Sequence, residues 1–272
     1  MRRFSRGVVV SLLTVTLAGS ALAGAVWAQA KPDLTVALSS FSTETLDPAL
    51  GGHLVKYYLS MMFDYLVGTT LDGQPSKDGG IATRWESSPD YKRWTFYLRK
   101  GVKFHNGDEL TSEDVKFSIM RNIGPRSTTG YAGPLRTLIQ TIETPAPDRV
   151  VIVTKDSTLI VPTYLSRSLS TEGMVLPKKY IEQVGDDVFA RKPVGSGPYR
   201  FVEQVTGSHI KLAAVDNHWR IGTPKYKNMI FKLVPEETTR LALLRRGDVD
   251  VADVSRERVK GVEAALRRGR LG

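Results

Sequence analysis

The chain has 272 residues and no cysteine, which excludes disulfide bonds, thiolate catalysis and cysteine-ligated metal centres. Its formal net charge of +10 would suit a nucleic-acid partner only if the positive charge gathered on one folded face. Most of that charge lies at the two ends, because residues 1–30 carry +3 and residues 255–272 carry +4. We therefore expect no nucleic-acid partner.

The first thirty residues are typical of a cleaved signal peptide. Three arginines precede an uncharged stretch of apolar and small residues, and Ala28-Gln29-Ala30 matches a signal-peptidase site. A retained membrane anchor is the alternative, because the apolar run is nearly long enough to span a bilayer. The Ala-x-Ala site favours cleavage after Ala30. Since no cysteine is available for a lipid anchor, we expect a soluble periplasmic protein.

Short strands and helices alternate along residues 31–254. Residues 34–38 have the pattern of a buried first strand, and the apolar residues of 55–66 have helical spacing. Trp94, Phe96 and Leu98 alternate with more polar residues, as in a half-buried strand. Further strands are expected at 150–153, 199–202, 210–215 and 229–234, and helices at 111–122, 177–184 and 238–246. Because these elements interleave without a strict βαβ repeat, we expect an α/β fold with a mixed sheet.

Two of these helices have clear ends in the sequence. Thr111 is a suitable N-cap for helix 111–122, and the acidic residues after it face the unpaired amides of the first turn. Helix 238–246 is expected to begin at Thr238 and to end before Gly247.

No motif supports catalysis or a resident metal. No two of the four histidines stand four residues apart, the spacing that pairs ligands on one helix face. His105 has Glu109 four residues further on, but Asn106-Gly107 between them is a turn signal. We therefore interpret His105 as a polar turn residue.

Two further patterns also favour structural interpretations. Asp248, Asp250 and Asp253 lack the glycine and terminal glutamate of a calcium loop and are expected to face solvent on a strand-like run. Gly195-Ser196-Gly197-Pro198 lacks the third glycine of a dinucleotide loop and precedes a strand, which favours a tight turn. We expect no catalytic residue, no cofactor and no enzyme activity.

Residues 94–118 combine an aromatic strand, an Asn-Gly turn and a helix that opens with acids, and on physical grounds they are scaffold. The same run closely resembles the signature of the periplasmic solute-binding proteins of peptide/nickel-type ABC transporters, the extracellular solute-binding protein family 5. Other landmarks of that family stand in the expected order, with His218 in place of a usual tyrosine: Thr45-Leu46-Asp47-Pro48, Phe63-Asp64-Tyr65-Leu66-Val67, Gly195-Ser196-Gly197-Pro198-Tyr199, Asp216-Asn217-His218-Trp219 and Arg246-Gly247-Asp248-Val249-Asp250.

The resemblance implies a fold and a domain organisation. Family members are bilobed clamshells of the type II-like periplasmic-binding-protein class, built from α/β lobes, and they are much longer than this chain. By analogy, residues 31–254 correspond to the first lobe, made of two subdomains. Residues 255–272 would be the start of a largely missing second lobe or a truncation tail. We expect a complete protein to be monomeric.

The resemblance also implies a function, which is to capture a peptide or another small solute and deliver it to permease subunits in the inner membrane. Three segments of the first lobe contact ligands in peptide binders of the family. The matching ligand-binding positions here are Gly51, Gly52, His53, Tyr131, Ser168, Ser170 and Thr171. As an alternative, the Tyr131 side chain could pack on its own lobe, and the Ser and Thr residues could be ordinary loop residues, because both types are common in any surface loop.

Three alternatives to a peptide receptor stay open. A nickel or metal-chelate receptor belongs to the same family, but it usually takes ligating groups from the second lobe. An exported enzyme on the same fold would need a nucleophile and a base, and none is apparent. A peptide-binding chaperone would use the open lobe as an adhesive surface. The sequence does not identify the solute.

Overall fold

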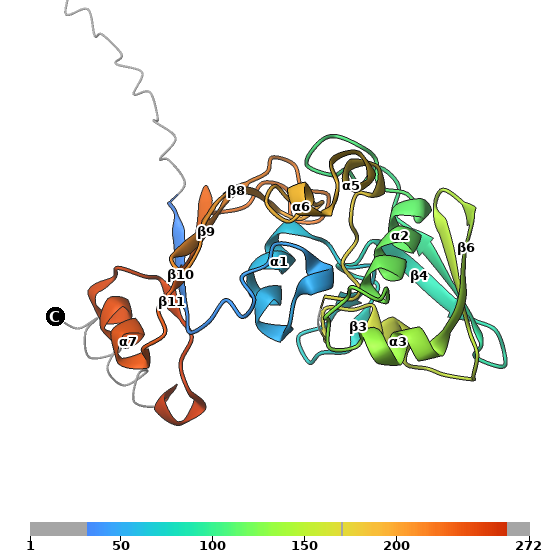
Figure 1. Cartoon of the computed structure of the whole chain (residues 1–272), viewed down its shortest axis with the longest axis horizontal. Coiled ribbons are helices and arrows are strands. Elements are labelled where there is room, and N and C mark those ends of the chain that lie inside the picture. Colours follow the sequence, from blue (N-terminus) through green and yellow to red (C-terminus); the bar gives the residue numbers. More distant parts are fainter. Residues whose placement is uncertain (1–31, 170, 260–272) are drawn as a thin grey trace, which may run out of the picture. The chain divides into compact units, whose positions relative to one another are not determined.

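The structure is a computed structural model that describes residues 32–169 and 171–259 (Figure 1). In this part of the chain, three β-sheets are connected by short helices. No helix among these residues is both long and apolar enough to cross a membrane. The predicted cleavage after Ala30, the predicted ligand residue Ser170 and the basic end beyond residue 259 lie outside the described residues.

The first sheet has five strands in the order β11-β1-β10-β9-β8. Strand β1 pairs in parallel with β10 and β11, whereas β9 is antiparallel to both β8 and β10. The predicted strand 34–38 is confirmed, and the three later predicted strands differ from β8, β9 and β10 by no more than three residues at either end. The bounds are β1 (Leu34–Leu38), β8 (Tyr199–Val205), β9 (His209–Ala214), β10 (Asn228–Leu233) and β11 (Val251–Ala252).

The second sheet is antiparallel throughout, in the order β4-β5-β7-β6. The alternation predicted for residues 94–98 is confirmed, because the side chains of Trp94, Phe96 and Leu98 are all buried on one face of β5. A two-stranded hairpin of β2 (Gly68–Thr69) and β3 (Pro75–Ser76) forms the third sheet. The four strands of the second sheet are β4 (Ala82–Ser87), β5 (Arg93–Leu98), β6 (Ile139–Ala146) and β7 (Arg149–Thr154).

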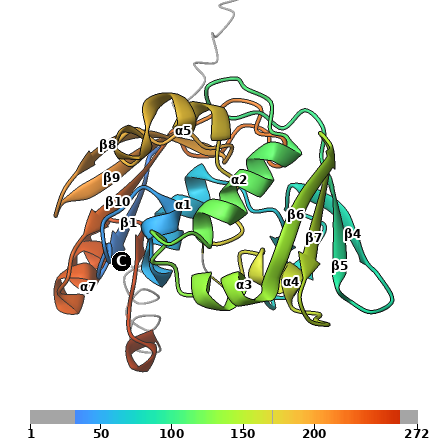
Figure 2. The ribbon, with the colours of Figure 1, turned by 45° about the vertical axis from the view of Figure 1, so that its right-hand side comes forward.

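Two helices cover the second sheet on the side of β6 and β7 (Figure 2). The first of them, α2, begins as predicted: Thr111 is its N-cap and forms a reciprocal capping box with Asp114. The helices are α1 (Lys56–Met62), α2 (Ser112–Asn122), α3 (Ala132–Leu138), α4 (Val161–Tyr164), α5 (Lys178–Val184), α6 (Asp186–Phe189) and α7 (Glu237–Arg246), with 3-10 turns at Pro48–Leu50, His53–Val55 and Arg256–Arg258.

Three sequence predictions need correction. The helix predicted for 55–66 ends at Met62, because the next residues are extended and their backbone pairs with Leu165 and Gly173. A short buried apolar run does not by itself distinguish helix from strand. Helix α7 begins at Glu237 rather than Thr238, although it ends as predicted at Gly247, which is left-handed with φ +78°. The strand-like run around Asp248 and Asp250 forms no strand, although both residues are exposed as predicted.

Two hydrophobic cores lie under these elements. One joins the buried face of the four-stranded sheet to α2 and α3, and Phe96 and Ile152 lie at its centre. The other joins the five-stranded sheet to α1, α5 and α6, and includes Tyr58, Phe63 and Phe189. Helix α1 therefore packs on the sheet that contains β1.

Candidate functional site

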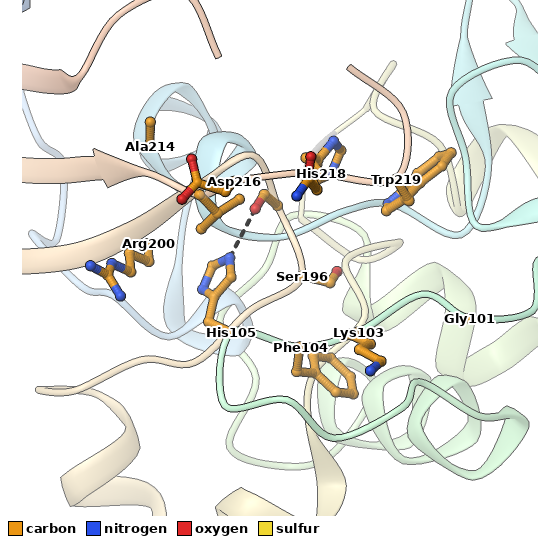
Figure 3. Close-up of a pocket in the computed structure, with 13 residues that line it drawn as sticks. Gly101, Lys103, Phe104, His105, Ser196, Arg200, Ala214, Asp216, His218 and Trp219 are labelled. Atoms are coloured by element: carbon orange, nitrogen blue, oxygen red, sulfur yellow. Dashed lines mark hydrogen bonds between the residues drawn. The ribbon is translucent and has the colours of Figure 1, made fainter. Parts of the chain in front are cut away.

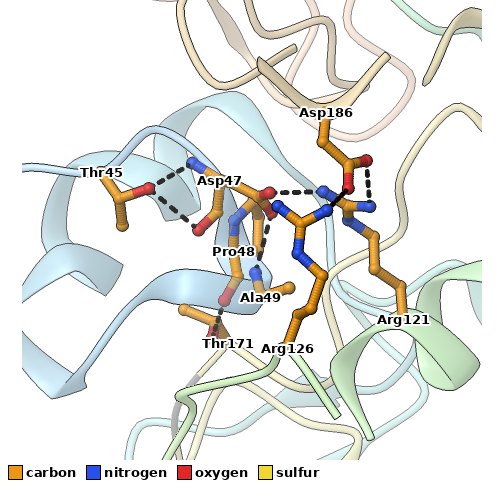
Figure 4. Close-up of polar contacts among 8 residues, drawn as sticks. All are labelled: Thr45, Asp47, Pro48, Ala49, Arg121, Arg126, Thr171 and Asp186. Atoms are coloured by element: carbon orange, nitrogen blue, oxygen red, sulfur yellow. Dashed lines mark hydrogen bonds and ion pairs between the residues drawn. The ribbon is translucent and has the colours of Figure 1, made fainter. Parts of the chain in front are cut away.

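The loop after β1 is held by a buried carboxylate (Figure 4). Asp47 accepts a hydrogen bond from the amide of Ala49 at 3.0 Å and caps the turn that follows. Arg121 of α2 donates to the other carboxylate oxygen of Asp47 at 2.5 Å and also contacts Asp186 of α6. Three separate elements are thus tied together next to the predicted ligand segment.

The first predicted ligand segment, Gly51 to His53, connects this loop to helix α1. Gly51 is buried and packs so closely on Val55 that a Cβ atom would lie 2.3 Å from the Val55 Cγ2 atom. A side chain at position 51 would therefore displace the start of the helix. Gly52 is half-buried and His53 is exposed, so the imidazole is available to a solute.

The second predicted contact, Tyr131, lies beside the first segment. The centre of its ring is 6.0 Å from that of His53 and 5.5 Å from that of Tyr164, and the planes are steeply inclined in both pairs. The contact with His53 is edge-to-face, an arrangement that is favourable for aromatic rings, and the contact with Tyr164 is tilted. The amide of Tyr131 donates to the Glu172 Oε1 atom at 2.9 Å, which fixes the backbone of the loop.

The third segment divides between two places. The Thr171 side chain is fully buried, and its hydroxyl donates to the Pro48 carbonyl at 2.8 Å (Figure 4). Thr171 therefore holds the turn that directly precedes the first segment. Ser168 is half-buried, and its hydroxyl donates to the Gly73 carbonyl of the β2–β3 hairpin at 2.5 Å. The structure thus brings His53, Tyr131 and Thr171 into one region and places Ser168 at its side.

Two charged residues of this region were missed by the sequence analysis. Glu172 is 1% exposed, and its Oε2 atom has no hydrogen-bond partner among the described residues. Lys56 donates to the Leu169 carbonyl at 3.2 Å. Burial, followed by the charge of Arg167, holds the pKa of Lys56 below its usual value, and the charge of Glu172 opposes this shift. The local sequence Ser-Thr-Glu-Gly is typical of a surface loop, so no local pattern indicated that the Glu172 side chain is buried.

The histidines of the family landmarks have structural contacts. His105 lies in the predicted turn, and its Nε2 and Nδ1 atoms are 2.8 Å from the Gly197 carbonyl and 3.3 Å from the Gly195 amide. His218 is buried with its Nε2 atom 3.2 Å from the Asp64 Oδ2 atom, which also accepts a hydrogen bond from the Trp219 indole at 2.7 Å. None of these contacts involves His53.

The region around His53 and Tyr131, which we call the ring surface, is suited to binding rather than to bond-breaking. It offers aromatic edges, an exposed imidazole and loop backbone, and such groups can hold an extended solute. The described residues contain no group of three or more His, Asp or Glu side chains placed to hold a metal ion.

The comparison with known families decides the class of the protein. A sequence model of the bacterial extracellular solute-binding proteins, family 5 Middle, matches residues 78–267. The chain belongs to this family. The resemblance found in the sequence is thereby confirmed. At the level of the family, its members are binding proteins of transport systems rather than enzymes.

Curated relatives carry names from peptide transport. The chain is 28% identical over 232 residues to the probable D,D-dipeptide-binding periplasmic protein DdpA of Escherichia coli, covering 81% of this chain and 43% of the relative. It is also 28% identical to the periplasmic oligopeptide-binding protein OppA of Haemophilus influenzae, covering 67% of this chain and 36% of the relative. The chain thus spans less than half the length of either relative.

Solved structures show the same fold. A complex of the binding protein MoaA with mannopinic acid, from A. tumefaciens R10, is 29% identical with a TM-score of 0.73, covering 83% of this chain and 45% of that one. A complex of AgaA with agropinic acid from the same source is 31% identical with a TM-score of 0.72, covering 81% and 43%. The predicted fold class, a mixed α/β part of a periplasmic-binding-protein clamshell, is confirmed.

Proposed function

We propose that this chain supplies one lobe of a receptor that captures a peptide or a similar small solute for an ABC transporter. Its share of the solute site is the ring surface. His53, Tyr131 and the backbone of Gly51 and Gly52 contact the solute. Ser168 borders the site, and Thr171 holds the loop beneath it.

The contact between His53 and Tyr131 is the observation that supports this proposal most strongly. The two residues belong to separate segments that the family resemblance indicates, and their rings lie 6.0 Å apart in the structure. Glu172 anchors the backbone of Tyr131, and Thr171 anchors the turn at Pro48 that precedes the first segment, so neighbouring residues of one loop hold both sides. A preorganised pair of rings loses little freedom when it binds a solute.

The proposed mechanism is closure around the solute. One lobe offers a wall with aromatic edges and free hydrogen-bonding groups, and a second lobe covers the other side of the solute. A hinge motion of this kind changes the surface that a membrane permease recognises. The name of the E. coli relative places that protein in the periplasm, which supports a periplasmic site of action here as well.

The solute class is a small molecule with polar groups at its ends. Relatives and similar structures are named for dipeptides, oligopeptides, heme, mannopinic acid and agropinic acid. A nickel-chelate receptor is less well supported, because the similar structure with bound nickel, NikZ with Ni(L-His), is only 23% identical and shows the fold alone.

Truncation of Tyr131 tests the proposal. The test uses the chain joined to the second lobe of a relative, and titration with a mixed pool of di- to hexapeptides, followed by native mass spectrometry, should detect bound solute. Tyr131→Ala should weaken binding about tenfold, because an aromatic side chain at the centre of a site often supplies more than ~1 kcal/mol. Tyr226→Ala removes a half-buried tyrosine away from these segments and should leave affinity unchanged. Binding that is equally strong in wild type and Tyr131→Ala would place the solute elsewhere.

A further inference from the structure

A separate cavity lies where three landmarks of the family meet (Figure 3). Its volume is about 440 Å³, within the range of sites for small organic ligands. It is bounded by the turn after β5, by the turn before β8 and by the segment that follows β9. The residues that give it polar or aromatic character are Lys103, Phe104, His105, Ser196, Arg200, Asp216 and Trp219, among others.

The charges around this cavity are mainly positive. Lys103 and Arg200 are exposed, and neither has an ion-pair partner among the described residues. They lie on opposite sides of His105 in Figure 3. The guanidinium of Arg99 adds a further cation, 4.7 Å from the centre of the Trp219 ring. Asp216 is the one acidic residue of the lining, and Asp64 contacts the lining residues His218 and Trp219 from outside it. Three cations thus face two carboxylates, so an anionic group is favoured.

An unpartnered hydroxyl in the lining also points to a ligand. Ser196 is 2% exposed, and its Oγ atom has no hydrogen-bond partner among the described residues. A buried hydroxyl without a partner is costly, and a ligand oxygen could accept its hydrogen bond. Both nitrogens of His105, by contrast, already contact the backbone of Gly195 and Gly197. The imidazole therefore fixes the wall of the cavity and leaves recognition to its neighbours.

The cavity and the ring surface lie at opposite ends of helix α1. The carbonyls of Met61 and Met62, at the end of the helix, are in close contact with Gly197 and Gly195, and the Gly197 amide donates to the Met62 carbonyl at 2.8 Å. His53 and Lys56 stand at the beginning of the same helix. A seven-residue helix is about 10 Å long, so one small solute does not fill both places.

We propose that this cavity is a second binding site, which takes a small organic carboxylate independently of the solute on the ring surface. Guanidinium and ammonium groups bind carboxylates well, and the Ser196 hydroxyl supplies a neutral donor. The side chains of Phe104 and Trp219 give the cavity apolar walls, which match the carbon skeleton of an organic acid better than an inorganic ion. The inference goes beyond the proposed transport function, because it concerns a different part of the lobe.

Titration of the chain with succinate, followed by amide chemical shifts, tests this site. Shifts should saturate below about 10 mM and centre on Gly197 and Trp219, with little change at Tyr131. Arg200→Gln and Lys103→Gln should each weaken succinate binding at least tenfold, and Ser196→Ala about threefold. Arg191→Gln removes the same charge from an exposed position outside the cavity and serves as the matched control.

The proposal of a carboxylate site is overturned by no saturable binding of succinate, by binding that Arg200→Gln and Lys103→Gln leave unchanged, or by shifts centred on Tyr131. Equal binding of inorganic phosphate would refute the assignment to organic carboxylates. Unchanged urea midpoints in the exposed-residue variants would show that any loss of binding does not come from unfolding. Because the peptide titration uses the ring surface, failure of either experiment leaves the other interpretable.

Discussion

His105 holds Gly197 in place through a hydrogen bond of 2.8 Å from its Nε2 atom to the glycine carbonyl. The Nδ1 atom of the same ring accepts from the Gly195 amide, so this pair of contacts requires the neutral imidazole. Burial lowers the pKa of His105 below its usual value of 6.5, in agreement with the neutral form. The turn assignment from the sequence is confirmed, but the ring also connects two turns that are distant in the chain.

The first prediction is that His105 makes the stability of the protein depend on pH. Because its pKa is lower in the folded state, the unfolded state binds more protons below the usual value, and stability is lost as the pH falls from about 6.5 toward the lowered pKa. The urea midpoint of the wild type should therefore fall between about pH 7.5 and about pH 5. His105→Gln cannot titrate and should show a smaller fall.

The cost of removing the ring is a second test of the same contact. His105→Ala should destabilise the protein by about 1–3 kcal/mol at neutral pH, because it leaves buried backbone groups without partners. A sequence-only interpretation as a polar turn residue implies almost no cost. A midpoint within error of the wild type, together with an identical pH dependence in His105→Gln, would show that the two turns do not depend on the imidazole.

The alternating face of β5 gives the third prediction. Trp94→Ala and Phe96→Ala should each destabilise the protein by about 3–5 kcal/mol, because both side chains are buried in the core of the four-stranded sheet. The Trp94 indole also donates to the carbonyls of Tyr91 and Thr158. Thr95→Ala, on the other face of the strand, should cost much less. Chemical denaturation compares the three, and similar midpoints would refute the assignment of the face.

Local patterns identified the strands with alternating or continuous apolar residues, and those with polar interruptions were missed. β5 and β1 were predicted almost to the residue, because burial on one or both faces leaves a periodic trace. β4 and β6 were missed, since Thr83, Arg84 and Glu143 break the alternation with polar side chains. Residues 63–66 were assigned to a helix, and only tertiary pairing with Leu165 and Gly173 makes this segment extended.

Family resemblance predicted which segments form the candidate site, but it did not predict the buried side chains that hold those segments in place. His53 and Tyr131 came from matched positions, and the structure adds that their rings meet. Glu172 and Lys56 could not be found, because the burial of a charged side chain depends on residues far away in the chain. The cavity beside His105 also escaped prediction, since three separate turns build it.

The N-terminus supplies a fourth prediction, which concerns residues outside the described part of the chain. The Ala28-Gln29-Ala30 site should direct cleavage so that the mature protein begins at Lys31. N-terminal sequencing of protein from a periplasmic extract would identify the first residue. Recovery from the membrane fraction with Met1 retained would instead establish an anchor.

The fifth prediction concerns the buried ion pair between Arg121 and Asp47 (Figure 4). The Asp47 side chain is 1% exposed and that of Arg121 is 16% exposed, so neither charge is well hydrated. Burial alone would lower the pKa of Arg121, but the carboxylates of Asp47 and Asp186 outweigh it and raise the pKa. Arg121→Met should destabilise the protein by about 3–5 kcal/mol, because it leaves the Asp47 charge buried without its partner.

Two further variants separate this charge effect from simple loss of packing. Arg126 also contacts Asp186, but its side chain is 72% exposed, so Arg126→Met should cost less than about 1 kcal/mol. Adding Asp47→Asn to Arg121→Met should restore part of the lost stability, because an amide can still accept from Ala49 and carries no charge. Urea unfolding of the single and double variants completes a cycle. If the double variant is less stable than Arg121→Met, the unpaired carboxylate is not the source of the loss.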